Sequence, residues 1–71
     1  MTIYILMEGC KPLRAFENIN IAKHQLESRM FALCKQGHRI VTCKDTEYTY
    51  ADPKNNSVRS TLYLTEIELQ R

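Results

Sequence analysis

Three cysteines and a histidine are the residues of this 71-residue sequence best suited to chemistry. Thiolates and imidazoles are the ligands that Zn²⁺ prefers, so Cys10, Cys34, His38 and Cys43 form a conceivable Cys₃His set. Cys34 and His38 would also make a nucleophile and base if they faced each other. The short Cys-x₂₋₄-Cys knuckle is absent, however, and the commoner role of Cys34 and Cys43 is that of small core residues. We therefore predict no metal, no other cofactor and no catalytic residue.

Signatures of enzymes are also missing from the sequence. It contains no Gly-rich phosphate loop, and its two glycines are too few to build one. The Ser-x-x-Lys, G-x-S-x-G and H-E-x-x-H patterns do not occur. A chain of 8.3 kDa leaves little room for a deep, closed active site. The sequence thus predicts a binding protein that is not an enzyme.

Composition indicates one ordinary globular domain over residues 1–71. The sequence is 44% hydrophobic and 25% charged, with a net charge of +2 from interspersed residues, which excludes disorder and a basic stripe. A chain this short buries only roughly 60% of the surface that its unfolded form exposes. Its stability is then marginal without a disulfide, a metal or a second subunit.

The sequence favours a cytoplasmic location. Residues 1–9 are apolar but lack a basic segment and a small-residue cleavage site, so we interpret them as a strand and not as a signal peptide. No apolar run approaches the roughly 20 residues that span a bilayer, so no membrane association is expected. An odd, sparse set of cysteines is typical of free thiols in a reducing compartment.

One amphipathic helix is predicted over residues 18–36. Asn18 is a good N-cap because its side chain accepts a backbone hydrogen bond in the first turn. Gly37 suits the position after the helix, and Lys35 complements the helix dipole in the last turn. Apolar residues recur on one narrow face. They are Ile19, Ala22, Leu26, Met30 and Leu33.

Segments rich in β-forming residues flank this helix. They cover residues 2–8, 13–16, 38–51 and 58–70. Gly9 begins a turn after the first segment, and residues 52–57 are dense in turn formers between the last two. The predicted fold is an α+β, two-layer ββαββ domain with one helix on a small antiparallel sheet and a long C-terminal β-hairpin.

The apolar residues change parity along both arms of that hairpin. They are odd-numbered and then even-numbered in 38–51, and even-numbered and then odd-numbered in 58–70. Pairing residues whose numbers sum to about 110 aligns the two changes near Asp45 and Thr65. A hairpin that buries one face near its base and the other near its tip accounts for this, as does a bulge or bend near Asp45.

The passage from the second strand into the helix runs through Ala15, Phe16, the cap Asn18, Ala22 and Leu26. It resembles the strand-to-helix passage of many small ββαββ proteins encoded by bacteriophages, and the resemblance in layout covers most of the chain. It contains no functional motif, so it transfers no functional residue. The resemblance implies an accessory protein that modulates or inhibits a larger host or phage protein.

Two groups of residues are candidates for binding a partner. Phe31 lies about 130° around the helix from the centre of the apolar stripe, with His24 and Lys35 nearby, so it is predicted to face outward. Tyr48, Tyr50 and Arg59 line the C-terminal hairpin. Tyrosine is favoured at interfaces because it joins apolar area to a polar hydroxyl. The alternatives are a single exposed apolar residue and tyrosines that only cover the sheet.

These features predict a protein-binding module that acts on a larger protein and forms a homodimer. A long C-terminal strand at the sheet margin would also pair edge-to-edge with another chain. The alternative function is nucleic-acid binding. Lys44, Lys54 and Arg59 would then contact phosphates, and Tyr48 or Tyr50 would stack on bases.

Overall fold

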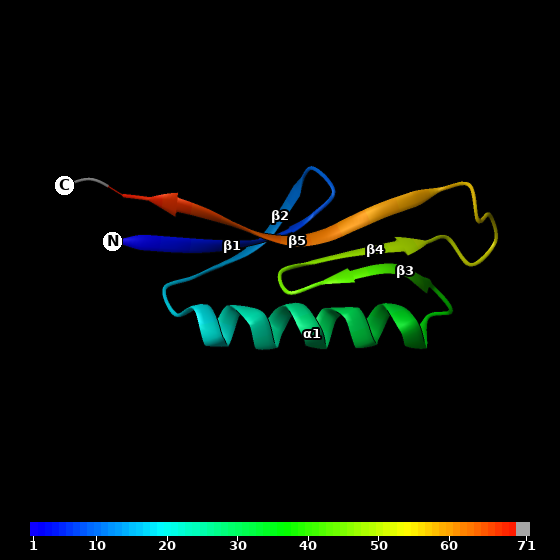
Figure 1. Cartoon of the computed structure of the whole chain (residues 1–71), viewed down its shortest axis with the longest axis horizontal. Coiled ribbons are helices and arrows are strands. Elements are labelled where there is room, and N and C mark those ends of the chain that lie inside the picture. The colour runs from blue at the N-terminus through cyan, green and yellow to red at the C-terminus, as the bar shows by residue number, and fades with distance from the viewer. Residues whose placement is uncertain (70–71) are drawn as a thin grey trace.

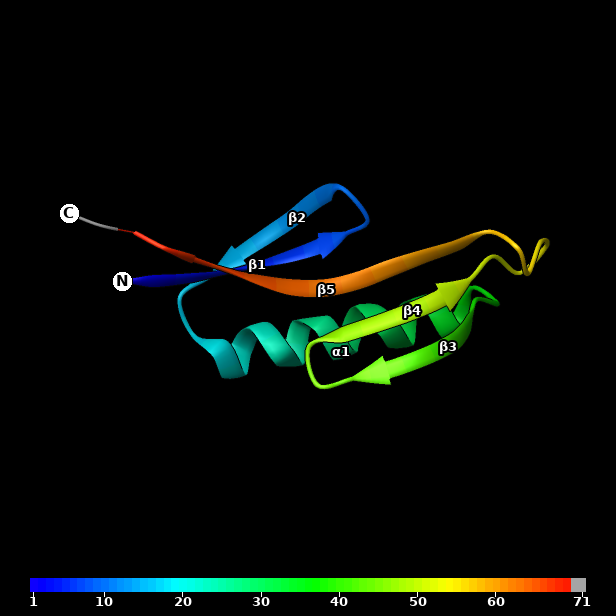
Figure 2. The same ribbon diagram turned by 45° about the horizontal axis from the view of Figure 1, so that its top comes forward.

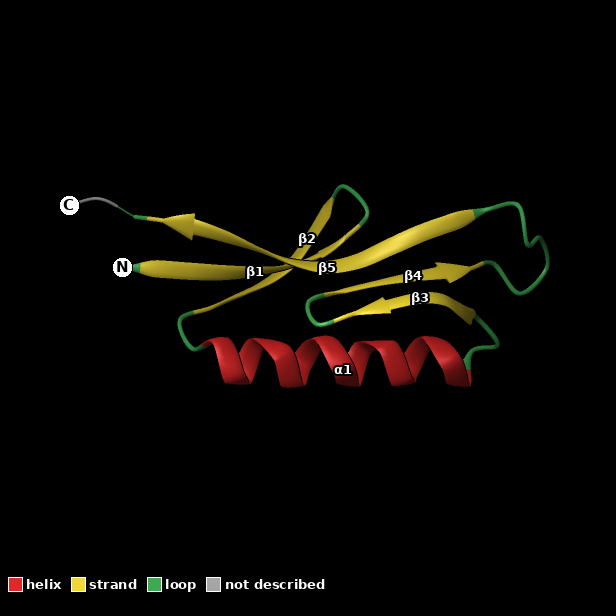
Figure 3. Cartoon of the chain, viewed as in Figure 1, coloured by secondary structure: helices red, strands yellow, loops and turns green. Residues whose placement is uncertain are grey.

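Strand-forming residues from both ends of the chain meet in one sheet. The computed structural model describes residues 1–69, which form one helix and a five-stranded antiparallel sheet in two layers (Figure 1, Figure 3). The elements are β1 (Thr2–Glu8), β2 (Lys11–Phe16), α1 (Ile19–Lys35), β3 (Arg39–Lys44), β4 (Glu47–Ala51) and β5 (Arg59–Glu68). The strand order is β2-β1-β5-β4-β3, so β5 occupies the centre of the sheet. The predicted α+β class and single helix are confirmed.

The helix begins and ends where its capping residues are. The side chain of Asn18 accepts hydrogen bonds from two backbone amides of the first turn, at 2.8 and 3.3 Å. Gly37 has a φ of 94°, a conformation that glycine adopts without a Cβ clash. The amide of His38 then reaches back to the carbonyl of Leu33 at 3.1 Å, as in a Schellman cap. Both predicted caps are thereby confirmed.

The apolar face of α1 covers one face of the sheet. Ala22, Leu26 and Leu33 are buried, while Ile19 and Met30 are half-buried beside them. Leu6 of β1, Tyr50 of β4 and Leu62 of β5 are the buried strand residues that form one cluster with Leu26 and Leu33. Among residues 1–69, the opposite face of the sheet has no helix over it (Figure 3).

The segment 38–51 forms two strands and not one, which makes the predicted ββαββ layout wrong. The chain reverses at Asp45 and Thr46, so the element order is ββαβββ. Cys43 lies opposite Tyr48 across this turn, which explains the change from odd-numbered to even-numbered apolar residues. Among residues 1–69 only glycines have positive φ. The turn therefore uses ordinary backbone angles and needs no Gly or Asn-Gly signature.

The predicted register, in which the numbers of paired residues sum to 110, is confirmed for the pairing of β4 with β5. It holds from Glu47 opposite Tyr63 to Ala51 opposite Arg59. Beyond that point the prediction fails, because Thr65 lies opposite Ile5 of β1 and not Asp45. The predicted strand 58–70 is observed as β5, and its last residue, Gln70, lies outside the described residues.

Strand β5 has different neighbours along its length. Its first part pairs with β4, its last part pairs with β1, and only a short middle section around Leu62 and Tyr63 pairs with both. The two hairpins therefore extend in opposite directions from the middle of β5 (Figure 2). This stagger gives the molecule its elongated dimensions of 46 × 19 × 18 Å.

Candidate protein-binding surfaces

The outward face of α1 consists of exposed residues spaced three or four positions apart. They are Ile21, His24, Ser28, Phe31 and Lys35. Phe31 is 55% exposed, which confirms its predicted outward orientation, and Ile21 is 54% exposed. The exposure of Ile21 was not predicted from the sequence. Its helical spacing from Phe31 could have indicated this. Binding of a partner by this face stays a prediction.

Tyr50 lies in the core, which corrects its prediction as a surface contact. It is only 7% exposed because β4 turns it toward α1. Its hydroxyl donates a hydrogen bond of 2.9 Å to Oε1 of Glu8, and Nη2 of Arg29 lies 3.1 Å from Oε2 of the same carboxylate. The ring of His38 meets the Tyr50 ring edge-on, with centroids 5.3 Å apart. Tyr50 is therefore a structural residue.

The electrostatics of this network favour an ionised Glu8 and a neutral Tyr50. Burial opposes ionisation of Glu8, but the Tyr50 hydroxyl and the Arg29 guanidinium outweigh it and lower the pKa of the carboxyl group. Burial raises the pKa of Tyr50, and its hydrogen bond to the Glu8 carboxylate raises it further. The network thus joins α1 to the sheet through one shared charge.

The residues predicted to bind nucleic acid do not share a surface. Tyr48 is half-buried against the core on the face toward α1. Arg59 is exposed, but strand alternation places it on the opposite face, because it lies across from Ala51 and not from Tyr50. Lys44 lies 3.8 Å from Glu47 in an exposed ion pair. Lys54 belongs to the loop between β4 and β5. This set therefore offers no common stacking and phosphate-binding site.

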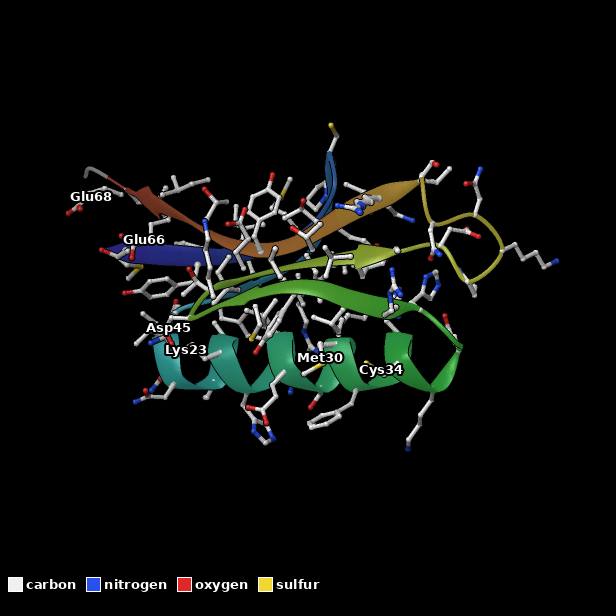
Figure 4. The ribbon with its side chains drawn as sticks, turned by 45° about the vertical axis from the view of Figure 1, so that its right-hand side comes forward. Lys23, Met30, Cys34, Asp45, Glu66 and Glu68 are labelled. Carbon is white, nitrogen blue, oxygen red and sulfur yellow. The ribbon has the colours of Figure 1, made fainter. Side chains whose placement is uncertain are left out.

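All three cysteines are free and exposed, so the prediction that Cys34 and Cys43 are core residues is wrong. Cys34 lies outside the buried stripe of α1, and Cys43 lies on the outermost strand, β3. The Sγ atom of Cys34 is 3.8 Å from Sδ of Met30, and Figure 4 labels both residues on α1. His38 instead lies with Nδ1 3.2 Å from the carbonyl oxygen of Ala51. Residues 1–69 contain no cluster of three metal-ligating side chains.

The C-terminal half of β5 exposes backbone hydrogen-bonding groups on one edge. Thr61 accepts a hydrogen bond from Gly9, and Leu69 donates one to Met1, so the odd-numbered residues of β5 bond toward β1. The even-numbered residues bond toward β4, as the bond from the Leu64 amide to Thr46 shows. Strand β4 begins at Glu47, opposite Tyr63, so nothing among residues 1–69 pairs with the outer edge of β5 beyond Leu64.

Two glutamates and two apolar residues surround this open edge. Glu66 and Glu68 carry the outward-directed amides and carbonyls, and both side chains are exposed. Ile67 and Leu69, 42% and 47% exposed, alternate with them. Figure 4 shows the glutamates at the end of the molecule where Lys23 binds Asp45 at 2.9 Å. The candidate binding surface of β5 is thus its unpaired edge. The sequence pattern does not reveal this edge, because it does not show which strands pair.

No pocket forms within the described part of the chain. No helix among residues 1–69 is long and apolar enough to cross a membrane. No protein-family model, curated protein or solved structure matches the chain.

Proposed function

We propose that this protein is a binding module for a larger protein and that it accepts a strand of its partner along the open edge of β5. One observation carries the proposal: the amides and carbonyls of Glu66 and Glu68 point away from β1, and no strand of residues 1–69 lies beyond them. A row of free backbone groups beside a formed sheet is a template for strand addition.

The neighbouring side chains support the same role. Ile67 lies opposite Ile3 of β1, so an added strand would extend an existing apolar row and remove more of Ile67 from water. Main-chain hydrogen bonds would give affinity, and the side chains beside them would select the partner sequence. By occupying a segment of a larger protein, a module of this size would modulate or inhibit it.

Hydrogen exchange tests which backbone groups the partner uses. In the free protein we expect slow exchange at the amides of Thr65 and Ile67, which bond to β1, and fast exchange at Glu66 and Glu68. The tagged protein is used to purify its partner from native cells, and mass spectrometry identifies that partner. Adding the purified partner should slow exchange at Glu66 and Glu68. Unchanged exchange at both amides in a saturated complex would refute strand addition.

A matched pair of proline variants separates binding from folding. Glu66→Pro removes an amide that faces solvent, a place where an edge strand tolerates proline. Ile67→Pro removes an amide that bonds to β1 and should unfold this part of the sheet. We expect Glu66→Pro to keep the circular dichroism spectrum of the native protein and to lose the partner. Full partner binding by a folded Glu66→Pro variant would contradict the proposal.

A further inference from the structure

We infer that the strand accepted by β5 alternates basic and apolar residues, with its basic side chains on the face of Glu66 and Glu68. This inference rests on the proposed function and specifies the partner chemistry at the same edge. Side chains of neighbouring strands meet in pairs on each face of a sheet, so the two faces of β5 determine the two sets of side chains in an added strand.

The first face carries uncompensated negative charge. Glu66 and Glu68 are two positions apart on one strand and therefore point to the same side. Among residues 1–69 neither takes part in an ion pair, whereas Glu8 and Glu47 both do. A lysine or arginine directly across from each glutamate would make an opposite-charge pair of the kind that stabilises sheets.

The second face is apolar. Ile67 lies opposite Ile3, and Leu69 follows it at the end of β5 with its amide bonded to Met1. Strand alternation places this row opposite the glutamates. Valine, isoleucine or another apolar residue in the partner would pack beside Ile67 without a desolvated polar group.

The same charges disfavour a second copy of this chain at the edge. Antiparallel pairing of two β5 strands around Ile67 would place Glu66 of one copy opposite Glu68 of the other, and like charges directly opposite are destabilising. The outer strand β2 does carry Lys11 and Arg14, but Pro12 interrupts it and has no amide to donate. The edge therefore suits a foreign strand better than the β5 or β2 strand of a second copy.

Short blocked peptides test the charge pattern directly. Three probes alternate valine with lysine, threonine or glutamate, and each is titrated into the full chain while amide exchange at Glu66 and Glu68 is followed by NMR. We expect the lysine peptide to bind most tightly and to slow both amides. The variant E66Q/E68Q should bind it roughly 2- to 30-fold more weakly, the range that two cross-strand charge pairs supply.

Charge reversal distinguishes complementarity from a general loss of structure. E66K/E68K should prefer the glutamate peptide, whereas the control E27K should keep the wild-type preference for lysine, because Glu27 is an exposed residue of α1 and has no cross-strand position beside an added strand. Equal affinity of wild-type protein for the lysine and threonine peptides would overturn the charge rule and leave strand addition in place.

Two further results would also overturn the inference. One is the failure of every peptide to slow exchange at Glu66 and Glu68. The proposed function would then still be tested by the hydrogen-exchange experiment with the purified natural partner, which does not depend on the peptides. The other is slow exchange at both amides without peptide, together with a dimer in analytical ultracentrifugation. That result would identify a second copy of the chain as the occupant.

Discussion

The hydroxyl of Tyr50 donates its 2.9 Å hydrogen bond to Glu8 across an intervening strand, since β5 lies between β4 and β1 in the sheet. Arg29 of α1 reaches the same carboxylate. One carboxylate thereby connects both hairpins and the helix. Within the sheet the two hairpins are joined through β5, and this network adds a polar link between them to the apolar packing of α1.

Removing the Tyr50 hydroxyl is expected to weaken that link. Tyr50→Phe should lower the free energy of unfolding by about 1–3 kcal/mol, because the lost hydrogen bond has a charged acceptor. Urea denaturation at neutral pH measures the change. Tyr63→Phe is the control, since its hydroxyl bonds only to the neutral carbonyl of Gly9 at 3.1 Å and should contribute less. A larger loss for Tyr63→Phe than for Tyr50→Phe would contradict this account.

Acid should destabilise the protein through Glu8. The folded state lowers the pKa of this group below its ordinary value of 4.5, so its stabilising contribution is complete above that value. The contribution is lost as the pH falls through 4.5 and then through the lower folded pKa. Glu8→Gln should flatten the dependence of the unfolding free energy on pH in this acidic window. Glu27→Gln, at an exposed position, serves as the control, and equal curves for both variants would exclude Glu8 as the cause.

Two residues of α1 test the orientation of the helix. Leu26 is buried, so Leu26→Ala should cost roughly 2–5 kcal/mol of stability. Phe31 is exposed, so Phe31→Ala should stay within about 0.5 kcal/mol of the wild type. Both residues share the same helix caps, which makes the comparison direct. If Phe31 is a contact residue, the second variant should also lose roughly 2 kcal/mol of partner binding. A loss of several kcal/mol of stability in Phe31→Ala would show that the outward face is misassigned.

The glycine after the helix should be more sensitive than the glycine of the first turn. Gly37 has a φ of 94°, and an added Cβ would lie 3.4 Å from Cβ of Pro53. Gly9 has a φ of 62° and free space around it. We expect Gly9→Ala to cost about 1 kcal/mol and Gly37→Ala about 1–3 kcal/mol, because a φ of 62° lies within the left-handed region that other residues occasionally adopt, whereas a φ of 94° lies outside it. Thermal unfolding of the two variants checks the order.

Local signals predicted the helix, and pairing signals predicted part of the sheet. Asn18 and Gly37 determine the helix ends through their own backbone and side-chain geometry, so they were readable in sequence. The register of β4 with β5 was also readable, because turn-forming residues 52–57 define it. The reversal at Asp45 was not, because a turn with negative φ has no special residue requirement.

The candidate surface was less accessible to sequence than the fold. Phe31 was predicted correctly because helical periodicity alone decides its exposure. Tyr50 was misassigned because strand alternation allows either face and only packing against α1 selects one. Glu66 and Glu68 have the pattern of an ordinary solvated strand face. Their position beside an open edge depends on β4 beginning at Glu47, opposite Tyr63, which is a long-range property of the sheet.

The central position of β5 also has a consequence for how the protein acquires its structure. The β1–β2 and β3–β4 hairpins are made from residues close in sequence, whereas Thr2 pairs with Glu68 across almost the whole chain. Such distant pairing incurs a large loop-closure entropy and limits the folding rate. During synthesis, each hairpin would leave the ribosome before the strand that unites them. Until β5 is translated, the nascent chain holds Leu6 and Tyr50 without the Leu62 side chain that completes their packing.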